Sequence, residues 1–213
     1  MSTDFLYPFI ERDEHDAAAL LDDLAASAAA KTAASDRLRS ETLDAAGAEI
    51  DAAAAAMAAC FQAGGRLFTF GNGGSATDAD GIAALFQQPP WGRPLPARSL
   101  VADRAVLTAL ANDVGFDLVF SRQLIAHGRA GDMALGVSTS GSSRNLLHAF
   151  TEAGRLGLRT LGLAGYDGGG MRAAGLDHCL VVRSDSVHRI QEAEAAVTFA
   201  LWAAVQRALE DHA

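Results

Sequence analysis

The stretch Gly71-Asn72-Gly73-Gly74-Ser75 follows a short apolar run at 67–70 and precedes a helix-like pattern. A second turn of this kind, Ser138-Thr139-Ser140-Gly141-Ser142-Ser143, follows the apolar run 133–137 and also precedes a helix-like pattern. Glycine lets backbone N–H groups approach an anion closely, and the hydroxyl groups add further donors. Two such strand-to-helix turns in one chain therefore predict a phosphate site.

The chain after residue 65 alternates short apolar runs with helical patterns. We expect strands at 66–70, 98–102, 133–137, 160–164 and 179–182, helices at 75–87, 104–110, 116–127, 143–156 and 187–209, and loops at 88–96 and 165–170. This alternation indicates an α/β fold in three layers, αβα, with a parallel sheet covered by helices on both faces. Ligands of such sheets bind beyond the carboxyl ends of the strands, which is where both turns lie.

Residues 16–63 are rich in alanine and contain no proline. Because alanine is the strongest helix former, we expect two long helices here, the second beginning near Ser35. We therefore predict a helical extension at residues 1–35 and a main domain at residues 36–213. The alanine-rich helices predict either an interface between subunits or a cover for one face of the sheet, and both alternatives stay open.

The composition argues against several classes of partner. The net charge of −9 argues against nucleic acid and anionic membranes, since these need clustered Lys and Arg. No apolar run reaches the roughly 18 residues of a membrane span, and the acidic first residues are unlike a signal peptide. We expect a cytoplasmic protein in which Cys60 and Cys179 are core residues.

Two other interpretations of the turns compete with the phosphate site. Residues 71–76 also satisfy the dinucleotide fingerprint Gly-x-Gly-x-x-Ala, and Asp103, although it follows the next strand somewhat late, could hold a ribose. A dinucleotide site, however, leaves the second turn unexplained. A purely structural interpretation treats Ser75 and Ser143 as helix N-caps. We favour the phosphate site because the second turn carries several hydroxyl groups where one would suffice for a cap.

Several motifs, in the same order, resemble the SIS (sugar isomerase) domain, and in particular its phosphoheptose isomerase branch. They are the turns at 71–76 and 138–143 and the segments 112–116, 120–123, 131–132, 165–169 and 189–192. The resemblance extends from about Asp36 to the C-terminus. It implies a five-stranded, flavodoxin-like parallel sheet with added N-terminal helices, assembled as a homotetramer or otherwise a dimer, with sites between subunits.

The resemblance also implies a set of binding residues for a heptose 7-phosphate or a similar sugar phosphate. The phosphate-binding residues would be Ser138, Thr139, Ser140 and Ser143, and the sugar-binding residues would be Asn72, Gly73, Ser75, Asp113 and Gln191. The branch interconverts sedoheptulose 7-phosphate and an aldoheptose 7-phosphate through an enediol. Such a reaction requires a base and an acid within hydrogen-bond reach of the sugar.

The chain departs from the family where the acid–base residues are expected. Gly81 and Leu85 stand where the family has a histidine and a glutamate, and Phe199 stands where it has a second histidine. Some relatives place zinc among these groups together with a glutamine, but here only Gln191 remains, so we expect no metal and no cofactor. His188 replaces an aspartate that often precedes this glutamine.

His188 is the best candidate for a rebuilt catalytic site because histidine titrates near neutral pH. The other candidates are Asp78, Asp80 and Glu194. The simpler interpretations are that His188 is a capping or surface group and that Glu194 faces a neighbouring subunit.

We therefore expect a non-catalytic or regulatory protein that binds a phosphorylated sugar and copies of itself. Two alternatives stay open. One is a sugar-phosphate isomerase with a rearranged acid–base pair. The other is an oligomeric adaptor whose partner is another protein, because the same branch includes a regulator that binds a replication initiator.

Overall fold

The computed structural model describes residues 17–210, and its contacts divide the chain into two units, residues 1–37 and 38–213. Helix α1 (Ala17–Gln62) begins in the first unit and ends in the second. The prediction of two helices with a break near Ser35 is wrong, because this stretch has no proline and its one glycine, Gly47, has open space around it. Residues 1–16 of the predicted extension lie outside the described residues.

The second unit alternates strands and helices along the chain. Its strands are β1 (Leu67–Gly71), β2 (Ala97–Ser99), β3 (Met133–Ser138), β4 (Arg159–Gly165) and β5 (His178–Val182). The helices that follow α1 are α2 (Gly74–Gln87), α3 (Arg104–Val114), α4 (Val119–His127), α5 (Arg144–Leu156), α6 (Gly169–Ala173) and α7 (Val187–Glu210), with the 3-10 turn η1 (Phe116–Leu118) before α4. The predicted alternation of strands and helices is confirmed.

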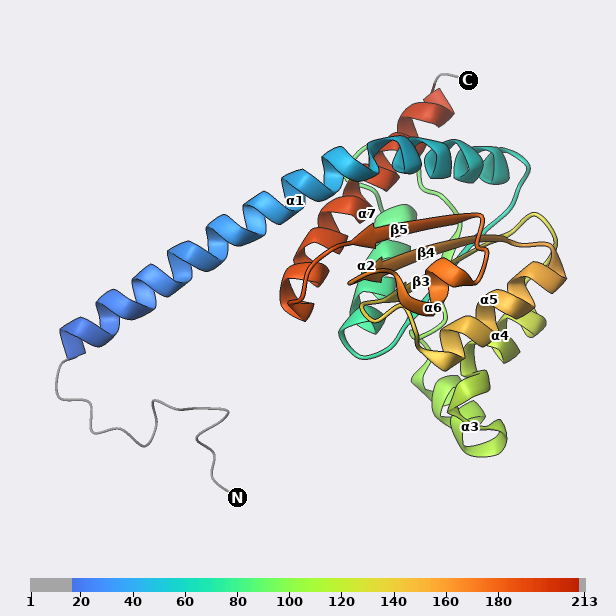
Figure 1. The fold of residues 1–213 in the computed structure, drawn as a ribbon. Coiled ribbons are helices and arrows are strands. Elements are labelled where there is room, and N and C mark those ends of the chain that lie inside the picture. Colours follow the sequence, from blue (N-terminus) through green and yellow to red (C-terminus); the bar gives the residue numbers. More distant parts are fainter. Residues whose placement is uncertain (1–16, 211–213) are drawn as a thin grey trace. The chain divides into compact units, whose positions relative to one another are not determined.

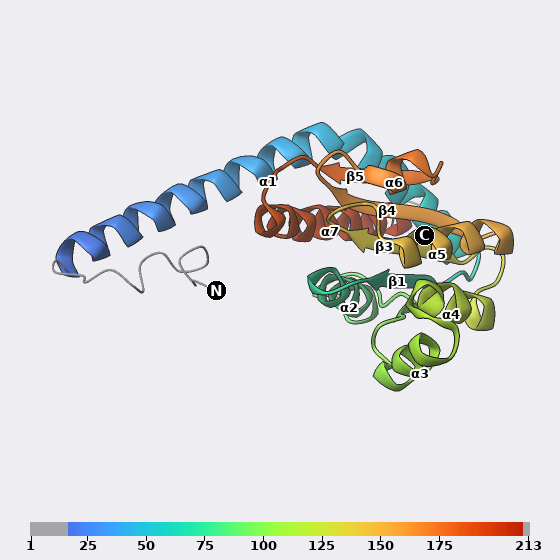
Figure 2. The same cartoon turned by 60° about the horizontal axis from the view of Figure 1, so that its bottom comes forward.

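All five strands run parallel, in the order β2-β1-β3-β4-β5. Figure 2 shows β1, β3, β4 and β5 as successive neighbours in this sheet. The order reverses between β1 and β3, and the register places Gly71 opposite Val137, so these two strands end side by side. The predicted flavodoxin-like sheet is confirmed. The two turns, at 71–75 and 138–143, both leave the sheet at the point where ligands of such sheets bind.

Two buried clusters hold helices on opposite faces of the sheet. One joins α1, α2 and α7 to the sheet and includes the fully buried Trp202. The other joins α4 and α5 to the opposite face, where the Phe70 ring lies 5.4 Å from the Phe120 ring and 5.3 Å from the Phe150 ring. Figure 1 shows α2 and α7 on one side of the sheet and α4 and α5 on the other. The predicted three layers are therefore confirmed.

One short helix lies where we predicted a loop. Helix α6 begins after Gly168, whose φ of 92° suits glycine, and the carboxylate of Asp167 accepts a hydrogen bond from the Gly169 N–H. None of the helices between residues 17 and 210 is long and apolar enough to cross a lipid bilayer.

Candidate functional site

A pair of asparagine side chains joins the two turns. The amide of Asn72, in the first turn, and the amide of Asn145, at the start of α5, exchange two hydrogen bonds of 2.9 Å each. Asn145 is 2 % exposed, so its side of this contact is buried, while Asn72 is partly exposed. Asn145 is not among the predicted site residues, although an amide two residues after a hydroxyl-rich turn is a usable signal. The contact brings together the two segments that we predicted to share one anion.

The serine hydroxyl groups of the second turn form a cluster. The Ser138 Oγ lies 3.4 Å from the Ser140 Oγ and 3.2 Å from the Ser143 Oγ. Ser143 is the N-cap residue of α5, but its side chain makes no capping hydrogen bond. The cluster therefore lies at a helix N-terminus, where the helix dipole favours an anion, and the capping interpretation of the Ser143 hydroxyl is wrong.

The backbone of α6 and the residues before it hold the second turn in place. Gly141 has a φ of 61°, and a Cβ at this position would lie 2.1 Å from the Gly168 oxygen. The Gly141 carbonyl accepts a hydrogen bond of 2.7 Å from the Met171 N–H, and the Ser142 Oγ accepts one of 3.1 Å from the Gly170 N–H. The glycines of the predicted loop at 165–170 thus allow the close backbone approach that fixes this turn.

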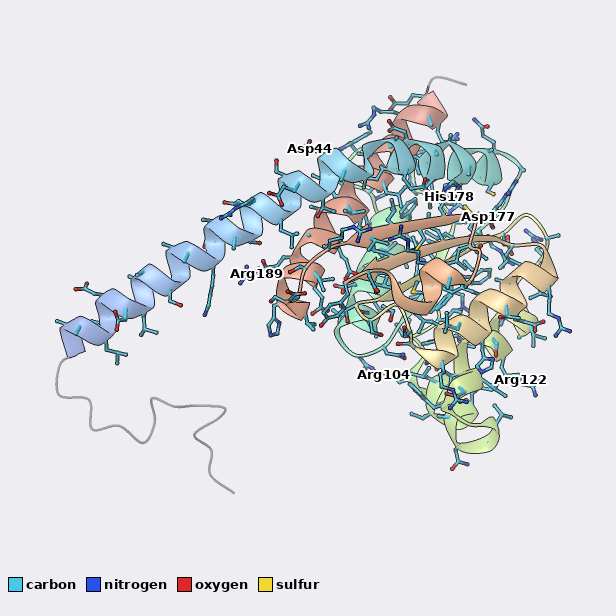
Figure 3. All side chains as sticks on the ribbon, viewed as in Figure 1. Asp44, Arg104, Arg122, Asp177, His178 and Arg189 are labelled. Carbon is cyan, nitrogen blue, oxygen red and sulfur yellow. The ribbon has the colours of Figure 1, made fainter. Side chains whose placement is uncertain are left out.

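The first turn borders a cavity on the side of α3. The cavity has a volume of about 360 Å³, and its polar lining includes Asn72, Thr77, Asp80 and Arg104. Figure 3 labels Arg104 at the start of α3. Gly73 also lines the cavity, so two of the predicted sugar-binding residues face open space. Ser75 does not line it: it lies inside α2 and is 5 % exposed, and the N-cap residue of α2 is Gly73, so Ser75 is not the cap considered above.

On the side of α7, Gln191 contacts the first turn. Its Nε2 donates a hydrogen bond of 3.2 Å to the Asp78 Oδ2, and a Cβ on Gly74 would lie 2.3 Å from the same nitrogen. Burial raises the pKa of Asp78, while the hydrogen bond from Gln191 acts in the opposite direction. The structure therefore places Gln191 against the glycine turn, with the Asp78 carboxylate beside it, and its role in sugar binding stays a prediction.

Glu194 follows Gln191 by one helical turn and is 1 % exposed. Within residues 17–210, neither of its carboxyl oxygens has a hydrogen-bond partner. Burial, with a further contribution from the charge of Asp78, raises the pKa of Glu194 from 4.5 to about 8. The interpretation that Glu194 faces a neighbouring subunit is wrong, because this chain itself buries the side chain.

In the described part of the chain, no hydrogen bond or ion pair joins two of the predicted site residues to the turns. His188 is exposed in the first turn of α7, and no hydrogen bond links its ring to another described residue. Its neighbour Arg189, labelled in Figure 3, pairs with Glu192. The Asp113 Oδ1 accepts a hydrogen bond from Asn112 near the end of α3. The roles of His188 and Asp113 stay predictions.

The positions at which the resemblance implies acid–base groups offer no donor atoms. Gly81 is exposed with open space beside it, Leu85 packs against the buried cluster of α7, and Phe199 is half exposed with its ring 5.1 Å from the Trp202 ring. Among the described residues, no three His, Cys, Asp or Glu side chains come together as a metal site. Together with Gln191, these positions are where some relatives hold zinc. The set does not fit a zinc ion here, because Gln191 is its only member with a polar side-chain atom.

Comparison with known proteins gives one consistent family. The model of the SIS domain matches residues 32–165. A phosphoheptose isomerase of Sulfurimonas denitrificans is 52% identical over 124 residues, which cover 57% of this chain and 63% of that protein. One from Pelobacter propionicus is 44% identical over 158 residues, covering 73% of this chain and 83% of that protein.

A solved structure is similar over almost its whole length. The structure of phosphoheptose isomerase from Neisseria gonorrhoeae matches with a TM-score of 0.81 and 37% sequence identity. The match covers 86% of this chain and 99% of that chain.

Proposed function

The chain belongs to the SIS-domain family, in its phosphoheptose isomerase branch, and from this premise we propose that it binds a phosphorylated sugar and interconverts its ketose and aldose forms. The resemblance found in the motifs is confirmed at the level of the family. The substrate we propose is a seven-carbon sugar 7-phosphate, after the name that the relatives carry. This differs from our first expectation of a non-catalytic binding protein.

The observation that carries the proposal is the cluster of serine hydroxyl groups beside the glycine turn. The Oγ atoms of Ser140 and Ser143 lie 3.4 Å and 3.2 Å from the Ser138 Oγ, at the N-terminus of α5. Each charge-assisted hydrogen bond to a phosphate contributes roughly 1.5–3 kcal/mol. Three or four such bonds, with the dipole of α5, offset the cost of removing a phosphate dianion from water.

The phosphate at this cluster orients the sugar toward the first turn. Asn72 is fixed there by Asn145, and Gln191 lies over Gly74. These amides offer both donors and acceptors to sugar hydroxyl groups. The reaction then moves one proton between C1 and C2 of the open-chain sugar, near the polar groups at the start of α2 and α7.

Two other functions are tested by the same experiments. A protein that only binds the sugar phosphate is favoured by the apolar side chains of Leu85 and Phe199, which transfer no protons. An oligomeric adaptor would bind no sugar phosphate at all. We propose a homo-oligomer for either function, with a tetramer as the first expectation.

Thermal unfolding in the presence of sedoheptulose 7-phosphate tests the binding step, because a ligand that binds the folded state raises the melting temperature. We expect this increase for the wild type, its loss or reduction in Ser140→Ala, and no change in Thr151→Ala, which removes an exposed hydroxyl group on α5 far along the helix. Ribose 5-phosphate and fructose 6-phosphate, added in parallel, test the preference for seven carbons.

Turnover is measured separately, by following the ratio of ketose to aldose phosphate by NMR. Conversion by the wild type supports the isomerase. Binding without conversion supports the binding-only protein instead. An unchanged melting temperature with every sugar phosphate contradicts both and leaves the adaptor.

A further inference from the structure

The carboxyl group of Glu194 is buried near the Asp78–Gln191 pair of the first turn. Glu194 is 1 % exposed, and neither of its oxygens has a hydrogen-bond partner in the described part of the chain. An ionised carboxylate in such surroundings is strongly disfavoured, so the group is retained in its acid form. A glutamine or a leucine at this position would avoid that cost, so the retention of a carboxyl here requires an explanation.

The position of Glu194 connects it to the proposed sugar site. It lies one helical turn beyond Gln191 on α7, and Gln191 donates to the Asp78 carboxylate and covers Gly74. Asp78 is half-buried and lies one helical turn after Gly74 on α2. The order from the turn inward is therefore the glycine backbone, the Asp78–Gln191 pair and then the buried carboxyl of Glu194.

The charged groups around Glu194 are few. Asp78, on α2, is the one whose charge acts on it. On its own helix, Arg189 is paired with Glu192. Next to Glu194 on α7, Ile190 and Ala193 pack against apolar side chains. These are Val182 of β5 and Leu38 of α1. Asp78 and Glu194 thus form a pair of carboxyl groups with no cation between them in the described residues.

We propose, building on the isomerase function above, that Asp78 is the base that takes the proton from the substrate carbon and that Glu194 is the positioning residue that keeps the negative charge of the site on Asp78. Like charges close together disfavour each other, so the two carboxyl groups share one proton over neutral pH. Burial assigns that proton to Glu194, and the half-buried Asp78 is left ionised beside the turn. This division of roles between two carboxyl groups is set by their environments.

The proton balance of the reaction closes without any other reactant. The Asp78 carboxylate takes a proton from C1 of the ketose, and the C–H electron pair becomes the C1=C2 bond of an enediolate. The proton of the C1 hydroxyl group passes to the oxygen on C2, the carbonyl re-forms at C1, and Asp78 returns its proton to C2. Glu194 stays neutral throughout, so it adds no negative charge beside the enediolate.

The pH dependence of kcat tests this assignment. With sedoheptulose 7-phosphate as substrate, Asp78→Asn should lower kcat by about 100-fold or more, because an amide cannot accept the proton. The wild type should lose activity above about pH 8, where Glu194 ionises and repels the enediolate. Glu194→Gln should lack this decline, and Glu210→Gln, an exposed control on the same helix, should behave as the wild type.

The outcomes separate the assignment from the function on which it depends. A wild type that converts the substrate, together with Asp78→Asn of unchanged kcat, overturns the assignment alone, as does a decline above pH 8 that persists in Glu194→Gln. A wild type that converts no sugar phosphate overturns the isomerase function and the assignment with it. If Glu194→Gln does not fold, Glu194→Leu, which is also neutral and matches the apolar surroundings, gives the same comparison.

Discussion

Replacing Glu194 by glutamine is expected to remove much of the pH dependence of the free energy of unfolding between pH 5 and pH 8. The carboxyl is 1 % exposed, and burial followed by the charge of Asp78 raises its pKa from 4.5 to about 8. A carboxyl whose pKa is raised in the folded state contributes stability that is fully present below the unfolded pKa. That stability is lost as the pH rises through the folded pKa, because the unfolded chain ionises first.

The size of the effect follows from the difference between the two pKa values. One pKa unit corresponds to about 1.4 kcal/mol. The increase from 4.5 to about 8 therefore corresponds to a loss of about 5 kcal/mol of unfolding free energy across the interval. This is a large fraction of the roughly 5–15 kcal/mol that stabilises a typical domain. Glutamine is neutral in both states, so Glu194→Gln lacks this contribution and gains stability over the wild type as the pH rises.

Urea unfolding of the wild type, Glu194→Gln and Glu210→Gln at pH 5, 6, 7 and 8 measures the effect. The contributions of all other titrating groups are common to the three proteins and cancel in the differences between them. We expect the wild type and Glu210→Gln to lose stability in parallel, because Glu210 is exposed at the end of the same helix. If the wild type and Glu194→Gln also lose stability in parallel, the buried carboxyl is not held in its acid form and the reasoning is refuted.

Three further perturbations test other parts of the structure. Gly136→Ala should lower the unfolding free energy measured in urea by about 1–3 kcal/mol, because the new Cβ would lie 2.7 Å from the Phe150 Cζ. The matched change Gly154→Ala, in α5 with nothing within 4 Å of the new Cβ, should raise it by about 1 kcal/mol. Asn145→Ala removes both hydrogen bonds between the turns and should weaken sugar-phosphate binding about tenfold by calorimetry, with an unchanged affinity contradicting the role of this pair. Burial alone would raise the pKa of Asp177, but the hydrogen-bond donors on β4 outweigh burial and lower this pKa. The wild type should therefore lose stability in acid unfolding as the pH falls through the lowered pKa. Asp177→Asn should lack that loss.

Much of the fold could be predicted from the sequence because the turns leave strong local signals. A short apolar run that ends in glycine or serine residues identifies a buried strand and the start of the next helix, as at 67–75 and 133–143. The topology of a parallel sheet then brings both turns to one edge. The supposed break near Ser35 has no counterpart in the structure, because alanine gives a helix no stop signal.

The contacts that build the site were harder to predict because they join distant segments. Asn72 and Asn145 are 73 positions apart, and nothing in the spacing of either turn indicates that the two amides bond to each other. The burial of Glu194 was missed for another reason. Alanine occupies several positions around it on α7, and alanine is compatible with either face of a helix, so the pattern does not tell which face is buried.

The apolar contact between α2 and α7 helps to explain why Glu194 keeps its proton. Leu85 packs against the buried cluster that contains Val197 and Trp202, so the contact between these helices is apolar along the turns that follow Asp78 and Glu194. An apolar contact of this kind supplies neither a cation nor a hydrogen-bond donor, and a carboxyl buried beside it binds its proton more tightly. A glutamate placed at position 85 would add a second negative charge to that contact and compete with Glu194 for the same proton. We therefore expect Leu85→Glu to lower the unfolding free energy most at high pH, and to do so less in the Glu194→Gln background, because in that background the two carboxyl groups no longer oppose each other.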